Sequence, residues 1–117
     1  MRFEIGFGVG FTRDGTPIDP LQVAEATKVI LVEACRKFGG CNITSGQGAW
    51  MDGDTLVVEE SRTLVVDTHS GPGSRQGYED EKSAYELAQF IGRLLNQKAV
   101  HVTEAIGLRS YDQGVRV

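Results

Sequence analysis

Residues 3–11 read F-E-I-G-F-G-V-G-F, and this stretch determines what kind of fold the chain can adopt. Large apolar residues occupy the odd positions, whereas Glu4 and three glycines occupy the even ones. Alternation with a period of two is typical of a β-strand that lies with one face on a core. The other face would be almost bare backbone, and glycine inside a strand often marks the close approach of a ligand or another segment. We therefore expect a strand whose two faces have different roles.

The segments on either side of this strand predict the rest of the fold. Asp19 followed by Pro20 is a typical helix start, and an apolar stripe at helical spacing continues from there to Gly39-Gly40. Residues 41–51 and 55–68 predict two strands joined by a turn at Asp52-Gly53. After a polar loop over residues 69–81, a second helix carries apolar residues up to Leu95, and residues 100–106 predict the last core strand.

This order of elements, β-α-β-β-α-β, predicts a ferredoxin-like α+β fold. Its sheet would have four antiparallel strands, with both helices on one face. We interpret residues 1–117 as a single domain in which residues 107–117 form a polar C-terminal tail. The opposite face of the sheet would then be a self-association surface, the floor of a ligand site, or simply solvated.

The middle of the third strand is charged, with Glu59, Glu60 and Arg62 between two apolar ends. Two arrangements explain such a centre: either a bulge rotates these side chains outward, or they point into the open face of the sheet. The sequence alone leaves the direction of Arg62 undetermined, because a single bulge would reverse it.

A short motif in this region resembles a known group of proteins. The stretch from Gly46 to Trp50, the turn at Asp52-Gly53, and Glu60-Ser61 ahead of an apolar strand are similar to a family of small uncharacterised α+β domains. The resemblance covers residues 46–66. It implies an α+β fold and no particular activity.

Composition and charge disfavour several classes of function. The net charge of −4 disfavours binding to a nucleic-acid polymer, which requires a basic surface. No apolar stretch has the length of a membrane span, and we see no secretory signal, so we expect a cytoplasmic protein, in the host cytosol if viral. For the same reason Cys35 and Cys41 are expected to be reduced thiols rather than a disulfide. No cofactor is predicted.

A set of residues has the chemistry to bind a small phosphate-bearing or nucleotide-like ligand. Glycine-rich backbone ahead of a helix can hold an anion, arginine binds two phosphate oxygens, and aromatic rings stack on bases. The loop matches neither the phosphate-binding P-loop nor the dinucleotide-binding motif. Taken singly, the loop can also be a mobile surface segment and each arginine a surface ion-pair partner. The candidate ligand-binding residues are Trp50, Arg62, His69, Ser74, Arg75, Tyr78 and Arg109.

The sequence offers little for catalysis. Glu59 and Glu60 are adjacent, so a regular strand points them to opposite faces and they cannot act as a carboxylate pair. Asp67 and His69 share a face and could form an acid–base pair, but with His101 as the only other histidine there are too few ligands for a zinc site. We predict no catalytic residue and no metal site.

Three hypotheses follow for function. The first is a non-enzymatic homo-oligomeric protein that holds a small phosphate-bearing or nucleotide-like ligand between its subunits, such as a phage-encoded sponge that sequesters a nucleotide signal. The second is a small dimeric enzyme of the isomerase or cofactor-free oxygenase type that uses Glu59, His69 or His101 in the sheet cleft. The third is a structural interaction module without a ligand.

Overall fold

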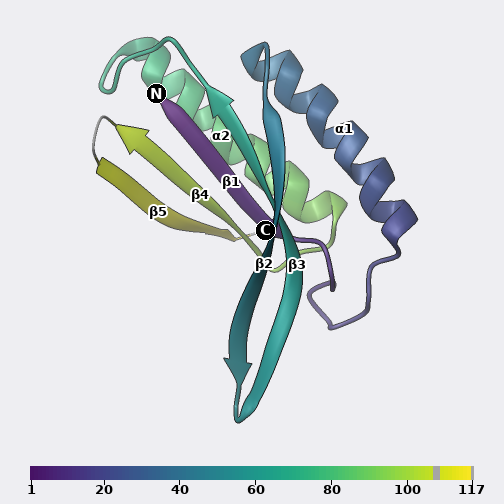
Figure 1. Ribbon diagram of the computed structural model, residues 1–117. Helices are drawn as coiled ribbons and strands as arrows, with labels where there is room; N and C mark the ends of the chain where they lie inside the picture. Colours follow the sequence, from purple (N-terminus) through teal and green to yellow (C-terminus); the bar gives the residue numbers. More distant parts are fainter. Residues whose placement is uncertain (107–108, 117) are drawn as a thin grey trace.

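A computed structural model describes the backbone of residues 1–106 and 109–116 and the side chains of residues 1–104. Two helices lie against one face of an antiparallel sheet, and the opposite face is uncovered (Figure 1). In chain order the elements are β1 (Arg2–Gly8), α1 (Pro20–Phe38), β2 (Asn42–Asp52), β3 (Thr55–Asp67), α2 (Arg75–Leu94), β4 (Ala99–Ile106) and β5 (Arg109–Arg116). The predicted α+β class and the β-α-β-β-α-β order are confirmed.

The sheet has the strand order β2-β3-β1-β4-β5, so β1 lies at its centre between β3 and β4. The four predicted strands are present and antiparallel. The segment expected to be only a polar tail adds a fifth strand, which pairs with β4 from Ala99 opposite Arg116 to Ile106 opposite Arg109. An edge strand of this kind is held by backbone hydrogen bonds to one neighbour and needs no apolar pattern.

The core lies between the helices and the odd-numbered side chains of β1. Phe3 and Ile5 are fully buried and Phe7 is 4% exposed, as the alternation of the sequence predicted. From the helices, Ile30 of α1 and Leu87 of α2 are fully buried against them. Burial of large apolar side chains contributes about 1.5–3 kcal/mol each, so this layer holds the sheet to the helices.

Both helices begin at side-chain caps. Asp19 Oδ1 accepts the Leu21 N–H at 2.9 Å, which confirms the predicted start of α1. Ser74 Oγ accepts the Gly77 N–H at 3.0 Å, so α2 begins at Arg75. The expectation of a polar loop over residues 69–81 is therefore wrong at its second half, because residues 75–81 already form the first turns of α2. In the described part of the chain, no helix is both long enough and apolar enough to span a membrane.

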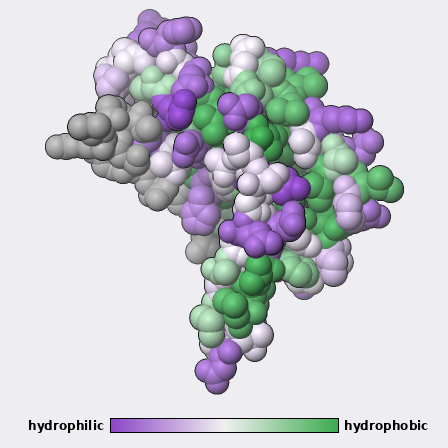
Figure 2. Space-filling view, in the orientation of Figure 1, coloured by the Kyte–Doolittle hydropathy of each residue, from purple (hydrophilic) through white to green (hydrophobic). Residues whose placement is uncertain are grey.

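The β2–β3 hairpin extends beyond the helices as an arm (Figure 1). Its turn lies at Gly53, whose φ of 61° is the positive value that such a turn requires, directly after Asp52 as predicted. Near the turn, Met51, Leu56 and Val58 are 61%, 62% and 50% exposed. Figure 2 shows apolar residues gathered along this projecting part.

One carboxyl group lies inside the helix-covered layer. Glu104 of β4 is 9% exposed, and its Oε1 has no hydrogen-bond partner among the described residues. Burial raises the pKa of Glu104, and the neighbouring Glu81 raises it further through its charge and a hydrogen bond. The folded state therefore favours the protonated carboxyl, and ionisation of Glu104 costs stability.

Glu104→Gln should stabilise the protein at neutral pH by about 1 kcal/mol, because it removes a buried charge while keeping the shape of the side chain. Because the pKa of Glu104 is raised in the folded state, the ionised form weakens the fold as the pH rises through that value. At about pH 4 the carboxyl is mostly protonated in the folded state, and the gain should shrink. Urea denaturation at both pH values measures this difference.

The control for this substitution is Glu79→Gln, which removes the same charge from an exposed position on α2. An equal gain for Glu104→Gln at acidic and neutral pH, or an equal gain for Glu79→Gln, would contradict the assignment of the effect to the buried carboxyl.

Candidate functional site

The strand register shows which side chains lie on the uncovered face of the sheet. Gly8 of β1 lies opposite Ser61, and Gly6 lies opposite both Thr63 of β3 and His101 of β4. Glu59 of β3 lies opposite Gly48 of β2. Because the register of β2, β3 and β1 is unbroken, no bulge occurs here. The second arrangement considered for the charged centre therefore holds for Glu59, whereas Glu60 and Arg62 point to the helix-covered side. The glycines leave a low floor between taller side chains.

The Glu59 side chain lies across Gly8, at the end of β1, and Gly10, two residues after it. Its Oε1 accepts hydrogen bonds from the N–H groups of Gly10 at 3.1 Å and Phe11 at 3.0 Å. A Cβ at Gly8 would lie 2.5 Å from Oε1, and a Cβ at Gly10 would lie 2.8 Å from Glu59 Cγ. Gly8 and Gly10 are therefore glycines because the Glu59 side chain occupies the space above them.

Together these residues form a cleft of about 360 Å³ on the uncovered face. This volume is at the lower end of the range for small-molecule sites, roughly 300–1,000 Å³. The glycines form its floor, and the Trp50 ring, the Glu59 carboxylate and the His101 imidazole stand around it. The complete lining is Gly6, Phe7, Gly8, Gly48, Trp50, Glu59, Ser61, Arg62, Thr63, Gln97, Ala99 and His101.

A larger hollow of about 480 Å³ lies between the start of α1 and the end of α2. Its lining is mainly apolar and includes Leu21, Val29 and Leu94, which are 74%, 42% and 42% exposed. Small-molecule sites combine apolar walls with a few converging polar groups that fix the orientation of the ligand. We favour the smaller cleft because a carboxylate, an imidazole and an indole converge there.

Two of the predicted ligand-binding residues border the cleft. Trp50 is 47% exposed and forms part of its wall. Arg62 also borders the cleft, but it lies opposite Phe7, on the helix-covered side of the sheet. Its Nη1 donates to the Ser61 carbonyl at 2.9 Å and contacts Glu60 Oε2 at 3.4 Å. The guanidinium is therefore already engaged with the chain's own acceptors.

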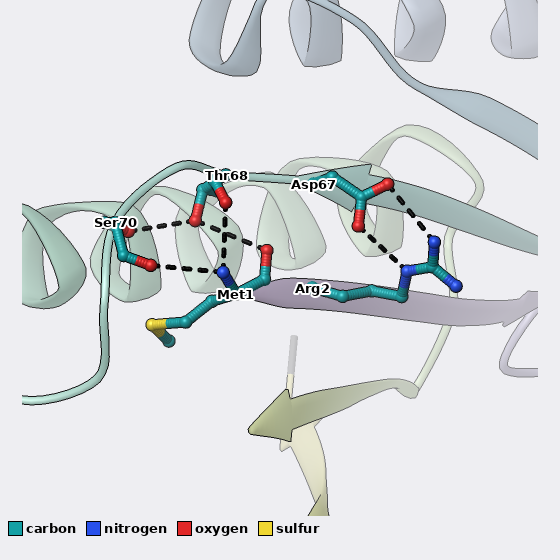
Figure 3. A network of polar contacts seen from close by, with 5 residues as sticks. All are labelled: Met1, Arg2, Asp67, Thr68 and Ser70. Carbon is teal, nitrogen blue, oxygen red and sulfur yellow. Dashed lines mark hydrogen bonds and ion pairs between the residues drawn. The ribbon is translucent and has the colours of Figure 1, made fainter. Parts of the chain in front are cut away.

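The predicted residues around α2 lie at the other end of the sheet, beside the start of β1. There the Met1 ammonium donates to the carbonyls of Thr68 and Ser70 at 3.0 and 3.1 Å (Figure 3). The loop carbonyls are thereby fixed to the N-terminus. Away from the cleft in this region are His69 in the loop, the cap residue Ser74, and Arg75 and the exposed Tyr78 on α2. Arg109 begins β5, and its side chain lies outside the described part of the chain.

Asp67, which could form an acid–base pair with His69, is already paired with Arg2. Asp67 Oδ1 accepts a hydrogen bond from Arg2 Nε at 2.9 Å (Figure 3), and this contact lowers the pKa of Asp67. Both partners are largely exposed, so the ion pair adds little to stability. Among the side chains of residues 1–104, no three metal-binding groups come together.

Some cleft residues were missed by sequence reasoning. Ser61 and Thr63 follow Glu59 on alternate positions of β3, so the period of two could have identified them as one polar row. Gln97 and Ala99 had no such signal. Gln97 is 8% exposed, and its Nε2 donates to the Phe11 carbonyl at 2.7 Å, which ties the entrance of β4 to the end of the glycine strand.

Comparisons with known proteins give a structural likeness but no sequence family. No protein-family model matches the chain, and no curated protein sequence matches it. A phage SAM lyase solved in complex with S-methyl-5'-thioadenosine aligns with 97% of this chain and 88% of its own, with a TM-score of 0.66 and 15% identity. The same kind of enzyme in its apo state gives a TM-score of 0.61, 16% identity and coverage of 97% and 87%. At this identity the likeness shows the fold alone: over nearly its whole length, the chain has the fold of a phage SAM lyase.

Proposed function

We propose that this protein binds a nucleoside-like ligand in the cleft on the uncovered face of the sheet. The observation that carries the proposal is the cleft itself, which is lined by the Trp50 indole, by glycines and by the Glu59 carboxylate that backbone N–H groups hold in place. A flat base can stack on the Trp50 ring, and the low floor admits a ribose. Glu59 provides the charged group that fixes the orientation of the ligand.

The charge of the cleft favours a particular class of nucleoside. Glu59 Oε2 has no hydrogen-bond partner among the described residues, whereas Oε1 has two. Arg62, the arginine that borders the cleft in the described part of the chain, is engaged by Ser61 and Glu60. A carboxylate repels phosphate and attracts a cation, so the site suits an adenosine-type sulfonium or thioether better than the phosphate-bearing ligand that the sequence suggested.

The comparison with phage SAM lyase supports the same class of ligand. That enzyme acts on S-adenosylmethionine and was solved with S-methyl-5'-thioadenosine, a thioether nucleoside. S-Adenosylmethionine carries a positive sulfonium, which would lie favourably near Glu59, and both compounds carry the adenine that Trp50 would stack on. The likeness in fold does not identify which residues of this chain would contact a ligand. The roles proposed for Trp50 and Glu59 therefore rest on the cleft of this chain.

Titration by fluorescence tests the proposal directly, because Trp50 is the single tryptophan of the chain and lies in the cleft wall. Addition of S-adenosylmethionine or S-methyl-5'-thioadenosine should change its emission in a saturable way, and adenosine monophosphate should bind at least about tenfold more weakly because of its phosphate. If neither the emission nor the thermal unfolding midpoint responds to any of the three, the proposal is wrong.

Catalysis is the second candidate function, and the fixed Glu59 carboxylate is the observation that favours it. Of the groups considered for an enzyme, Glu59 and His101 border the cleft, while His69 does not. Chromatography of S-adenosylmethionine after incubation with the protein distinguishes the two roles. Formation of S-methyl-5'-thioadenosine with turnover indicates a lyase, whereas stoichiometric retention indicates a sequestering protein such as a phage-encoded sponge.

Native mass spectrometry of the same sample reports whether the chain is a homo-oligomer, as the exposed apolar arm suggests.

A further inference from the structure

Two cysteines lie side by side at the junction of α1 and β2. Cys35 is in the last turn of α1, Cys41 directly precedes β2, and their Sγ atoms are 3.8 Å apart. Gly39 ends the helix with a φ of 85°, and its N–H donates to the Cys35 carbonyl at 2.8 Å. Gly39 and Gly40 therefore fold the chain back so that the two thiols meet. Both thiols are free.

We propose that Cys35 and Cys41 form a redox-active dithiol that a hydroperoxide converts into an intramolecular disulfide. The sulfur atoms are 3.8 Å apart, and a disulfide bond is about 2.05 Å long, so a small rotation of either side chain must bring them closer. The bridge would span residues 36–40, of which two are glycines that allow the backbone to adjust. This inference is independent of the proposed ligand.

The two thiols differ in accessibility, and this difference assigns their roles. Cys35 is exposed, so a small oxidant meets it first. Cys41 is partly buried, and burial together with the neighbouring Cys35 raises the pKa of Cys41 to about 11. Cys41 therefore stays protonated at neutral pH and acts second, as the thiol that resolves the oxidised Cys35.

The reaction balances with the peroxide as the only oxidant. The Cys35 thiolate attacks one peroxide oxygen, the O–O bond breaks, and Cys35 becomes a sulfenic acid while the other oxygen leaves as hydroxide. The Cys41 sulfur then attacks the Cys35 sulfur and loses its proton, the S–O bond breaks, and hydroxide leaves. Two thiols and one hydrogen peroxide give one disulfide and two waters, with two electrons passing from sulfur to oxygen.

The bridge would fix the end of α1 to the start of β2. A cross-link restricts the unfolded chain, so the oxidised protein should be more stable than the reduced one. The ligand cleft should not be affected, because Gly48 lies seven residues further along β2 than Cys41, roughly 20 Å away. A change in stability without a change in ligand binding separates this inference from the proposed function.

The experiment treats the purified full chain with hydrogen peroxide and measures free thiols, intact mass and the thermal unfolding midpoint. We expect both thiols to disappear, the mass to fall by two hydrogens, and peptide mapping to join Cys35 to Cys41 within one chain. The unfolding midpoint should rise by about 5 °C and return after reduction.

Cys35→Ser and Cys41→Ser serve as matched controls, and neither should show the loss of two hydrogens or the rise in midpoint. The inference is overturned if both thiols of the wild-type protein stay reactive, if oxidation stops at sulfenic or higher acids, or if disulfides form only between chains. Because the wild-type protein is compared with itself before and after reduction, the result stands even where a serine variant folds poorly.

Discussion

Glu59→Gln should weaken the binding of S-adenosylmethionine by about tenfold to a hundredfold, because it removes the charge that would face the sulfonium. Binding of S-methyl-5'-thioadenosine, whose sulfur is uncharged, should change much less. The amide keeps an oxygen that can accept the N–H groups of Gly10 and Phe11, so the shape of the cleft is preserved. Titration of Trp50 fluorescence with both compounds measures the difference.

Glu60→Gln is the matched control for this prediction. It removes the same charge one residue further along β3, but its side chain points to the opposite face of the sheet. If the two substitutions weaken S-adenosylmethionine binding equally, the overall charge of the protein is responsible and Glu59 has no special role.

Gly8→Ala tests the same site without changing a charge. The new Cβ would lie 2.5 Å from Glu59 Oε1, so the carboxylate has to leave its two backbone N–H partners. We expect this variant to fold and to reproduce the weaker binding of Glu59→Gln. Gly46→Ala, on the same face with a closest contact of 3.5 Å to Ser61 Oγ, should bind normally.

Phe3→Ala should lower the free energy of unfolding by about 3–5 kcal/mol, which is the largest effect on stability that we predict. Phe3 is fully buried on the central strand, opposite Val66 of β3 and Glu104 of β4. Its ring lies 6.4 Å from that of Phe38, so it also holds the end of α1. Small domains are stable by only about 5–15 kcal/mol, and a loss of this size consumes much of that margin.

Phe3→Leu is the control, since it retains most of the volume and should cost less than half as much. Urea denaturation followed by circular dichroism is the suitable measurement, because Trp50 lies on the arm, outside the core that contains Phe3. Equal losses for the two variants would show that the cavity left by the ring is not the cause.

Most of the fold followed from local patterns. The alternation of β1 predicted its buried residues because a strand on a core has only two faces. Asp19 and Pro20 predicted the start of α1 because they satisfy the first turn of a helix on their own. The turn after Asp52 was predicted because Gly53 readily adopts a positive φ. Each of these signals lies within a few residues of the structure that it determines.

Local sequence patterns predicted two elements incorrectly: the start of α2 and the strand β5. The first turns of α2 are polar because residues 75–81 lie mostly outside the core, and the apolar spacing begins only at Ala84. Ser74 as a cap was the signal that could have located the start. The strand β5 is equally polar, and it forms because β4 offers it a free edge. That edge exists only after the sheet has assembled.

The cleft could be anticipated only in outline. The glycines of β1 pointed to the uncovered face, and Trp50 and Arg62 were among the residues expected to form a site. Within one chain, His69, Ser74, Arg75 and Tyr78 do not lie with them, because these residues are beside the start of β1 at the other end of the sheet. Side chains of similar chemistry can be recognised in the sequence, but the sequence does not show at which end of the sheet the loop that carries them lies.

The sequence by itself determined that the chain begins with a strand that has an apolar face and a bare face, because alternation and side-chain size are local properties. The predicted strand of residues 3–11 was too long at its end, because β1 stops at Gly8. Only the tertiary structure determined what lies on the bare face. Glu59 crosses Gly8 and Gly10 from a strand 49 residues away and binds the backbone that the glycines leave accessible. Contacts of such separation depend on strand order and register, and these are set by the packing of the whole core.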